Sequence, residues 1–211
     1  AGIFDDIPTL QDGHIVVDEN GVPTEPEERV KENQYKLMPG MTYTKDPTVT
    51  VKAGSAESYV RLKVTFNNAK AIIAMCTDPE FADDGPTGVE NAFPLIRMVN
   101  FVEANAAKWD GIIPDNMVDT EEILADAKYF AYDAKEDTLT YYFYYTETVA
   151  APIADVKLPV LFDSVRIPTW VTLEQADALK NFKITVVAEA IQAATFGNAD
   201  AAWAAFSAQG N

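Results

Sequence analysis

The feature that most constrains the fold of this chain is a strict alternation of apolar and polar residues. It runs through the segment Tyr59-Val60-Arg61-Leu62-Lys63-Val64-Thr65-Phe66. A period of two places successive side chains on opposite faces of a sheet, whereas a helix requires a period of 3.6. The segment therefore predicts a half-buried β-strand with Val60, Leu62, Val64 and Phe66 in a core.

Further segments with β-branched or aromatic residues between turn signals indicate that most of the chain is β. We expect strands at residues 14–18, 47–52, 128–132, 138–146 and 182–192, and an edge strand at 161–168. The pair at 128–132 and 138–146 would meet across a turn at 133–137. Apolar residues at 93–102 fit a short helix or a buried strand equally well.

Three capped segments predict short helices between or after the strands. Thr120 precedes a helix to Ala127, and Thr172-Leu173-Glu174-Gln175 resembles a capping box that opens a helix to about Lys180. A terminal helix begins at Asn198-Ala199-Asp200, with Trp203 and Phe206 on one face. Strands with helical insertions indicate a mostly β protein, a jelly-roll-like antiparallel β-sandwich with a short C-terminal helix.

The composition favours an exported, acidic, soluble protein. Apolar residues make up 48% of the chain, enough for a core, and the net charge of −17 disfavours nucleic acid and anionic membranes as partners. No apolar run approaches the roughly 20 residues of a spanning helix. The chain begins with Ala1 rather than Met, from which we expect that a signal peptide has been removed. No linker divides the chain, so we expect one domain at 13–211 after a segment at 1–12.

Residue types used in catalysis are scarce, and we expect no enzyme and no cofactor. His14 is the only histidine, so a His-Glu-x-x-His zinc site cannot form, and no Gly-x-Ser-x-Gly elbow is present. Cys76 is the only cysteine, and its apolar neighbours would keep the thiol neutral and buried. No glycine-rich phosphate loop occurs.

Carboxylates are abundant, but their number prevents any choice of a catalytic pair. The chain holds 33 of them, so an acid–base pair for glycoside hydrolysis cannot be selected. Two acidic loops could bind structural calcium through oxygen atoms, although neither has the spacing of an EF-hand. The alternative for both loops is plain solvation; their acidic residues are Asp78, Asp83, Asp84, Asp115, Asp119 and Glu121.

The first twelve residues carry apolar side chains among small and acidic ones. Ile3, Phe4, Ile7 and Leu10 have no obvious local partner, and ordering such an arm costs about 1–2 kcal/mol per residue. Burying Ile3, Phe4 and Ile7 in a groove would return roughly 1.5–3 kcal/mol each. The arm therefore either completes a sheet in another molecule or packs on its own domain.

Several segments together resemble the exported TasA/camelysin family of Firmicutes, which a SipW-type signal peptidase processes. The resemblance covers about residues 34–66 and 141–206 and the start at Phe4-Asp5-Asp6-Ile7, whereas residues 67–135 match nothing in it. It rests on Tyr43-Thr44-Lys45-Asp46-Pro47-Thr48-Val49-Thr50-Val51, Ser58-Tyr59-Val60-Arg61-Leu62-Lys63-Val64, Leu161-Phe162-Asp163-Ser164-Val165-Arg166-Ile167-Pro168, Ala188-Glu189-Ala190-Ile191-Gln192-Ala193 and Ala202-Trp203.

The resemblance implies a secreted jelly-roll subunit of biofilm-matrix fibres. Its arm, residues 1–12 with Gly2, Ile3, Phe4, Ile7 and Leu10, would be the donor strand that completes a sheet in the next copy. The partners would be identical subunits and other matrix proteins. Camelysin is named a metalloprotease, but one histidine cannot supply its zinc site.

Two other functions stay open from the sequence. A monomeric surface adhesin or carbohydrate-binding module would use exposed aromatic residues such as Tyr141 or Trp170. A secreted hydrolase would use a carboxylate pair. If the chain polymerises, its charge predicts that salt, divalent cations or mildly acid pH will favour assembly.

Overall fold

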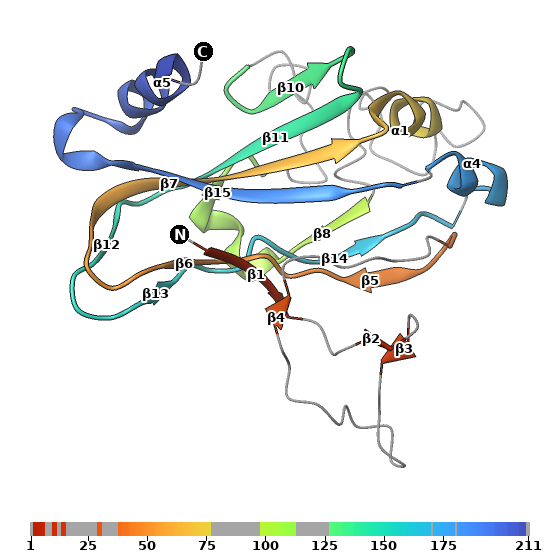
Figure 1. Cartoon of the computed structure of the whole chain (residues 1–211), viewed down its shortest axis with the longest axis horizontal. Coiled ribbons are helices and arrows are strands. Elements are labelled where there is room, and N and C mark those ends of the chain that lie inside the picture. Colours follow the sequence, from red (N-terminus) through yellow and green to blue (C-terminus); the bar gives the residue numbers. More distant parts are fainter. Residues whose placement is uncertain are drawn as a thin grey trace.

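The computed structural model of this chain describes residues 2–6, 10–11, 14–15, 29–30, 38–76, 98–112, 127–169, 171–179 and 181–209. For the four ranges before residue 38 the description covers the backbone alone. Within these residues the protein is mostly β, with several antiparallel sheets and short helices (Figure 1). The prediction of a mostly β protein is thereby confirmed.

The largest sheet is built around β7 (Ser55–Asn67), which contains the alternating segment. On one side β7 pairs with β11 (Thr138–Tyr145), and on the other with β15 (Ile184–Gln192). Three shorter strands extend this sheet: β10 (Phe130–Asp133) beside β11, β9 (Trp109–Asp110) at the end of β11, and β12 (Val149–Ala151) at the start of β7. At that start β7 curls, which turns the sheet into a half-barrel (Figure 1).

Two smaller sheets lie below the large one in Figure 1. One has the order β5 (Thr42–Thr44), β14 (Phe162–Arg166), β8 (Val99–Phe101). The other has the order β13 (Val156–Lys157), β6 (Thr48–Val51), β1 (Gly2–Asp6), β4 (Arg29–Val30). A separate short pair joins β2 (Leu10–Gln11) to β3 (His14–Ile15).

The structure corrects one prediction and resolves one alternative for these sheets. Residues 161–168 do not form an edge strand, because β14 has β5 on one side and β8 on the other. The cross-strand partners come from distant parts of the chain, which sequence periodicity does not reveal. Residues 99–101 of the ambiguous segment are a strand rather than a helix.

The core lies between the large sheet and the two smaller ones. Leu62, Val64 and Phe66 of β7 are fully buried, as the alternation predicted. They share the core with Phe143 of β11 and Phe162 of β14. The inward-facing row of β7 thus carries the apolar contact between the layers.

The described helices are short, and two of them begin where the sequence predicted a helix. They are α1 (Ala69–Cys76), η2 (Glu103–Lys108), α4 (Leu173–Ala178), η3 (Ala193–Thr195) and α5 (Ala199–Gln209). The capping box is confirmed, since the Gln175 amide donates to Thr172 Oγ1 at 3.1 Å. Asn198 caps α5 by accepting from the Ala201 amide. Most of the helix expected at 120–127 lies outside the described residues.

Among the helices described here, none has the length and apolar character that crossing a membrane requires.

Candidate assembly site

The first strand of the chain pairs with β6 through three of its residues. The antiparallel register is Gly2 with Thr50, Ile3 with Val49 and Phe4 with Thr48. Farther along, Asp5 and Asp6 pair with β4. Part of β1 also lies close to β15, the last strand of the large sheet (Figure 1). β1 therefore covers one edge of β6 and also lies next to β15 at the edge of the large sheet.

The acceptor strand β6 is buried along its whole length. Thr48, Val49, Thr50 and Val51 are each at most 7% exposed, although two of them are polar. A fully buried strand leaves no water for its main-chain groups, so both edges must be paired with other strands. One edge of β6 meets β13 and the other meets β1.

The main-chain groups of β6 divide between these two neighbours by position. The Leu158 amide donates to the Val49 carbonyl at 2.9 Å, so the polar groups of Val49 point toward the β13 side. Because an antiparallel ladder alternates, the groups of Thr48 and Thr50 point toward β1. By the same alternation Gly2 and Phe4 exchange hydrogen bonds with β6, and Ile3 does not.

The turn beyond β6 is tied to the loop between β12 and β13. Asp155 accepts from Lys52 Nζ at 2.7 Å and from the Ala53 amide at 2.8 Å. The side-chain hydrogen bond from Lys52 and the bond from the Ala53 amide lower the pKa of Asp155. The Gly54 amide also donates to the Ala151 carbonyl at 2.7 Å. The acceptor strand is thus continued by a rigid turn.

The predicted donor residues fall at different places in this arrangement. Gly2, Ile3 and Phe4 belong to β1 and pair with β6 of their own chain. Leu10 belongs to β2 and pairs with Ile15, whereas Ile7 lies outside the described residues. Pairing of the arm with another copy stays a prediction.

The sequence did not identify β6 as the acceptor of the arm. Residues 47–52 predicted only a half-buried strand, because polar threonines alternate with valines. The available signal was the uncharged, wholly β-branched run Thr48-Val49-Thr50-Val51. Such a run suits a strand that is covered on both faces and has neighbours on both edges.

A second cluster anchors the C-terminal helix to the outer face of the large sheet. Arg61 is only 7% exposed, and its Nε donates to Glu189 Oε2 of β15 at 2.6 Å. Its guanidinium lies 4.6 Å from the Tyr142 ring centroid and 4.4 Å from that of Trp203. The charge is therefore enclosed by its ion-pair partner and by aromatic faces, which stabilise a cation.

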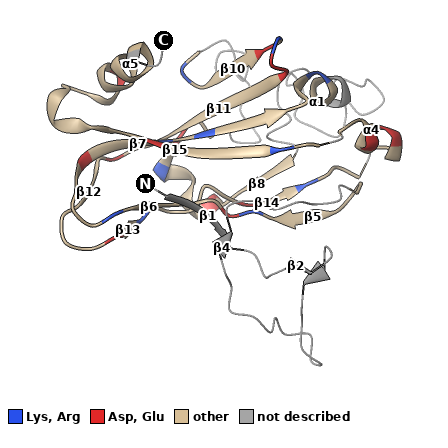
Figure 2. Cartoon of the chain, viewed as in Figure 1, with Lys and Arg blue, Asp and Glu red and all other residues tan. Residues whose placement is uncertain are grey.

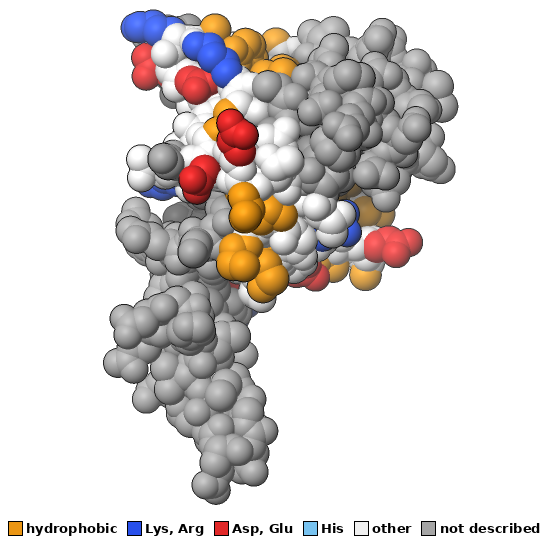
Figure 3. Space-filling view, turned by 90° about the vertical axis from the view of Figure 1, so that its right-hand side faces the viewer, with side chains coloured by type: hydrophobic (Ala, Val, Ile, Leu, Met, Phe, Trp, Pro, Cys, Tyr) orange, Lys and Arg blue, Asp and Glu red, His pale blue; other side chains and the backbone are white. Residues whose placement is uncertain are grey.

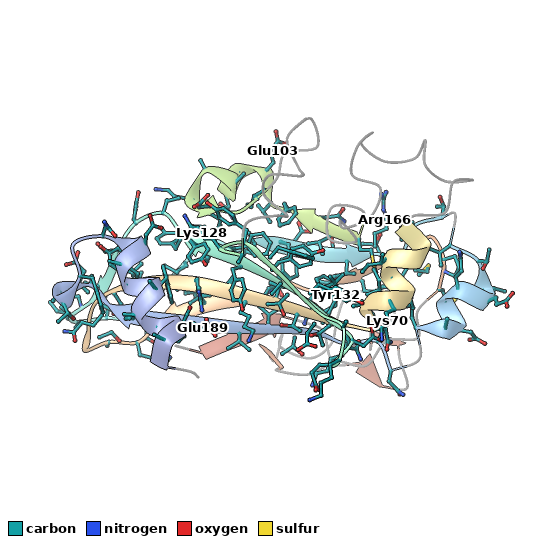
Figure 4. All side chains as sticks on the ribbon, turned by 90° about the horizontal axis from the view of Figure 1, so that it is seen from above. Lys70, Glu103, Lys128, Tyr132, Arg166 and Glu189 are labelled. Atoms are coloured by element: carbon teal, nitrogen blue, oxygen red, sulfur yellow. The ribbon has the colours of Figure 1, made fainter. Side chains whose placement is uncertain are left out.

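Beside this cluster lies Lys128 (Figure 4), whose Nζ is 4.9 Å from the Tyr129 ring centroid and 5.4 Å from that of Tyr144. Its Nζ lies 3.4 Å from both Asp110 and Asp200, the latter at the start of α5. Burial raises the pKa of Tyr144, against the lowering effect of Arg61, and the Tyr144 hydroxyl donates to the Lys128 carbonyl at 2.7 Å. These contacts hold α5 in place, and each charge has a structural partner.

Most of the residues weighed from the sequence for metal or carbohydrate binding lie outside the described part of the chain. Within the ranges that the structure covers, no group of histidine, cysteine and acidic residues could hold a metal ion. Both acidic loops proposed for calcium lie outside those ranges. Tyr141 is 4% exposed and packs in the core, so it is not available to bind a carbohydrate, and Trp170 is not described.

Comparisons of this chain with family models, with curated proteins and with solved structures find no match.

Proposed function

We propose that this protein is a non-catalytic subunit of an extracellular filament, in which β1 of one copy pairs with β6 of the next. The observation that carries the proposal is the position of β1. It is the first strand of the chain, and it fills one edge of a strand that is otherwise buried. In strand exchange such a strand leaves its own site and enters that of another copy, while β4, which pairs with Asp5 and Asp6, moves with it or loses that pairing.

Exchange between copies would reproduce the contacts of the single chain. Gly2 and Phe4 of the neighbour would take the same register on Thr50 and Thr48. The hydrogen bonds lost within a chain are regained between chains, so their net contribution to assembly is close to zero. What differs is the entropy of the connection at residues 7–47, which changes only slowly with loop length. A high protein concentration can then favour pairing of β1 with another copy over pairing within its own chain.

The edge of β6 that β1 covers must always be paired with a strand, because leaving it empty is costly. Without β1, the main-chain groups of Thr48 and Thr50 would lose partners in a buried strand. Leaving a buried donor or acceptor unsatisfied costs about 1–3 kcal/mol each. A copy whose arm has been withdrawn therefore binds any free arm of the same sequence.

The wider setting follows from the resemblance to the TasA/camelysin proteins. We propose export with removal of a signal peptide, a jelly-roll arrangement of the sheets and incorporation in a biofilm matrix, with other matrix proteins as further partners. The net charge of −17 suits a protein whose partners are neither nucleic acid nor anionic membrane surfaces, since both would repel it. No cofactor is needed for strand exchange.

Deletion of residues 1–8 tests the proposal. We expect a folded monomer that makes no filaments under conditions in which the full chain does, as seen by negative-stain electron microscopy. The matched control removes residues 210–211 at the other terminus and should polymerise normally. Filaments formed by the truncated chain, or a full chain that stays monomeric at every concentration and salt, would show that the strand-exchange proposal is wrong.

A further inference from the structure

The first strand of the chain has two partners, which divide its length between them. β1 pairs with β6 through its first three residues and with β4 through its last two. In the second pairing, Asp5 lies opposite Val30 and Asp6 lies opposite Arg29. β6 belongs to the body of the molecule, by which we mean the described residues from 38 onward. Exchange of β1 between copies must therefore either carry β4 along or break its pairing.

The strand β4 depends on β1 for its pairing. It has only two residues, and among the described strands β1 alone pairs with it. In Figure 1, β4 lies at the far end of β1, away from the large sheet. A short strand without a partner leaves its main-chain groups unpaired and is not stable by itself. If β1 left alone, β4 would lose the pairing that orders it.

The connection between β4 and the body is short. The turn before β5 is fixed to the body, because the Gly40 amide donates to the Ile167 carbonyl and the Ile167 amide donates to the Met41 carbonyl, each at 2.9 Å. Residues 31–37 alone separate β4 from the described start of the body, and they span at most about 29 Å when fully extended. The connection from β1 to β4, residues 7–28, is about three times as long. Short hinges favour exchange of an element between copies.

Moving β1 and β4 together avoids an unfavourable step. If β1 moved alone, the hydrogen bonds between β1 and β4 would break before the same bonds could form with another copy. If both strands move, those bonds persist, and only the pairing of β1 with β6 is exchanged. A paired strand also has less conformational freedom to lose on binding than a single strand has.

A unit made of β1, β4 and the chain between them carries a negative charge. Residues 1–30 hold eight carboxylates and one arginine. Beside the end of the acceptor strand, Lys52 follows β6 and is paired with Asp155, and Lys157 on β13 is exposed (Figure 2). These three side chains together carry a net positive charge, which suits an incoming acidic unit.

The described surface at the α4 end gives little support for a conventional interface there. Its apolar side chains form small groups between charged and polar ones (Figure 3). Interfaces between folded surfaces that hold stable complexes bury about 1,200–2,000 Å² and have an apolar centre. A strand transferred as part of a unit needs no such surface, because its main-chain hydrogen bonds form the contact.

We propose that β1 and β4 exchange between copies as one paired unit, with residues 31–37 as the hinge. The pairing of β1 with β4 stays within one chain, and only the pairing of β1 with β6 passes between chains. The alternative is that β4 stays with its own body and receives the β1 of a neighbour. This inference rests on the proposed function and specifies the element that each copy donates.

Disulfides placed at the two pairings test the proposal in the full chain. In a Cys76→Ala background, Asp6→Cys with Arg29→Cys probes the β1–β4 pairing and leaves the net charge unchanged, and Ile3→Cys with Val49→Cys probes the β1–β6 pairing. Residues directly opposite in an antiparallel pair lie about 4.5–5.5 Å apart at Cα, a distance that a disulfide bridges. Each variant is polymerised in reductant, then oxidised and run on a non-reducing denaturing gel.

We expect opposite results from the two pairings. The β1–β6 variant should give a ladder of covalent oligomers, whereas the β1–β4 variant should give monomers in which both thiols are consumed, as measured by mass spectrometry. A ladder from the β1–β4 variant as well, or free thiols in its filaments, would overturn the proposal and leave strand exchange intact. Monomers from the β1–β6 variant would instead contradict strand exchange itself.

A second pair of positions for each pairing separates the result from local misfolding. Gly2→Cys with Thr50→Cys probes β1–β6 again, and Asp5→Cys with Val30→Cys probes β1–β4 again. The two variants of one pairing should give the same pattern on the gel, because the pattern is set by which chain supplies each strand.

Discussion

At the scale of single residues, Arg61 illustrates how a surface position of a strand becomes buried. The alternation of residues 59–66 placed Arg61 correctly on the face away from the core, together with Lys63 and Thr65. What the alternation could not show is that α5 covers that face, with Trp203 stacked on the guanidinium. The result is a charge that is buried and depends on its partner Glu189.

Replacement of Arg61 should destabilise the fold much more than replacement of its neighbour on the same face. We expect Arg61→Met to lower the free energy of unfolding by about 3 kcal/mol, because Glu189 keeps its charge in a mostly buried site. Lys63→Met, a change of the same kind at a more exposed position, should alter it by at most about 0.5 kcal/mol. Urea unfolding followed by tryptophan fluorescence measures both.

The double variant Arg61→Met with Glu189→Gln tests the reason for this loss. Because no unpaired charge is left, it should regain a large part of the stability. Equal losses in the Arg61 and Lys63 variants, or no recovery in the double variant, would contradict the role of the buried ion pair.

At the scale of elements, the sequence predicted strands where side chains alternate and missed relations between distant segments. The strands β7, β11 and β15 and the cap of α4 all follow from local patterns. The central place of β14 and the pairing of β1 with β6 depend on which strand lies next to which. Neither a period nor a cap encodes that choice.

The alternation within β1 leads to a prediction that can be tested with peptides. A peptide of residues 1–12 should bind the variant that lacks these residues. N-methylation of Phe4 should abolish binding, because its amide faces Thr48, whereas N-methylation of Ile3 should be tolerated on the β6 side. Isothermal titration calorimetry measures the affinities. Equal loss at both positions would show that the register on β6 is wrong.

At the scale of the whole molecule, the negative charge is concentrated in three stretches of the sequence. Residues 1–37 hold nine carboxylates and three lysines or arginines, residues 77–97 hold five and one, and residues 113–126 hold five and none. The arm that is proposed to join subunits belongs to the first stretch. Part of the repulsion between copies therefore comes from the stretch that contains the arm, and counter-ions should relieve it.

Polymer yield should accordingly depend on salt and pH. We expect more filament near pH 5 than near pH 8, because some carboxylates take up protons as the pH approaches their ordinary pKa of about 4. At the higher pH, added salt or divalent cations should restore the yield through screening. Sedimentation of polymer followed by assay of the supernatant measures both. A higher yield near pH 8 at low salt would contradict the effect of charge.

The pairing of β7 limits how early the chain can fold during its synthesis. Its partners β11 and β15 come much later in the sequence. Ser58 of β7, for example, pairs with Gln192 of β15. A sheet with such remote partners closes slowly, and β7 cannot be paired on both edges before β15 has been synthesised. Until then the edge of β7 that β15 covers lacks its partner, which leaves a long strand edge open to pairing with other chains.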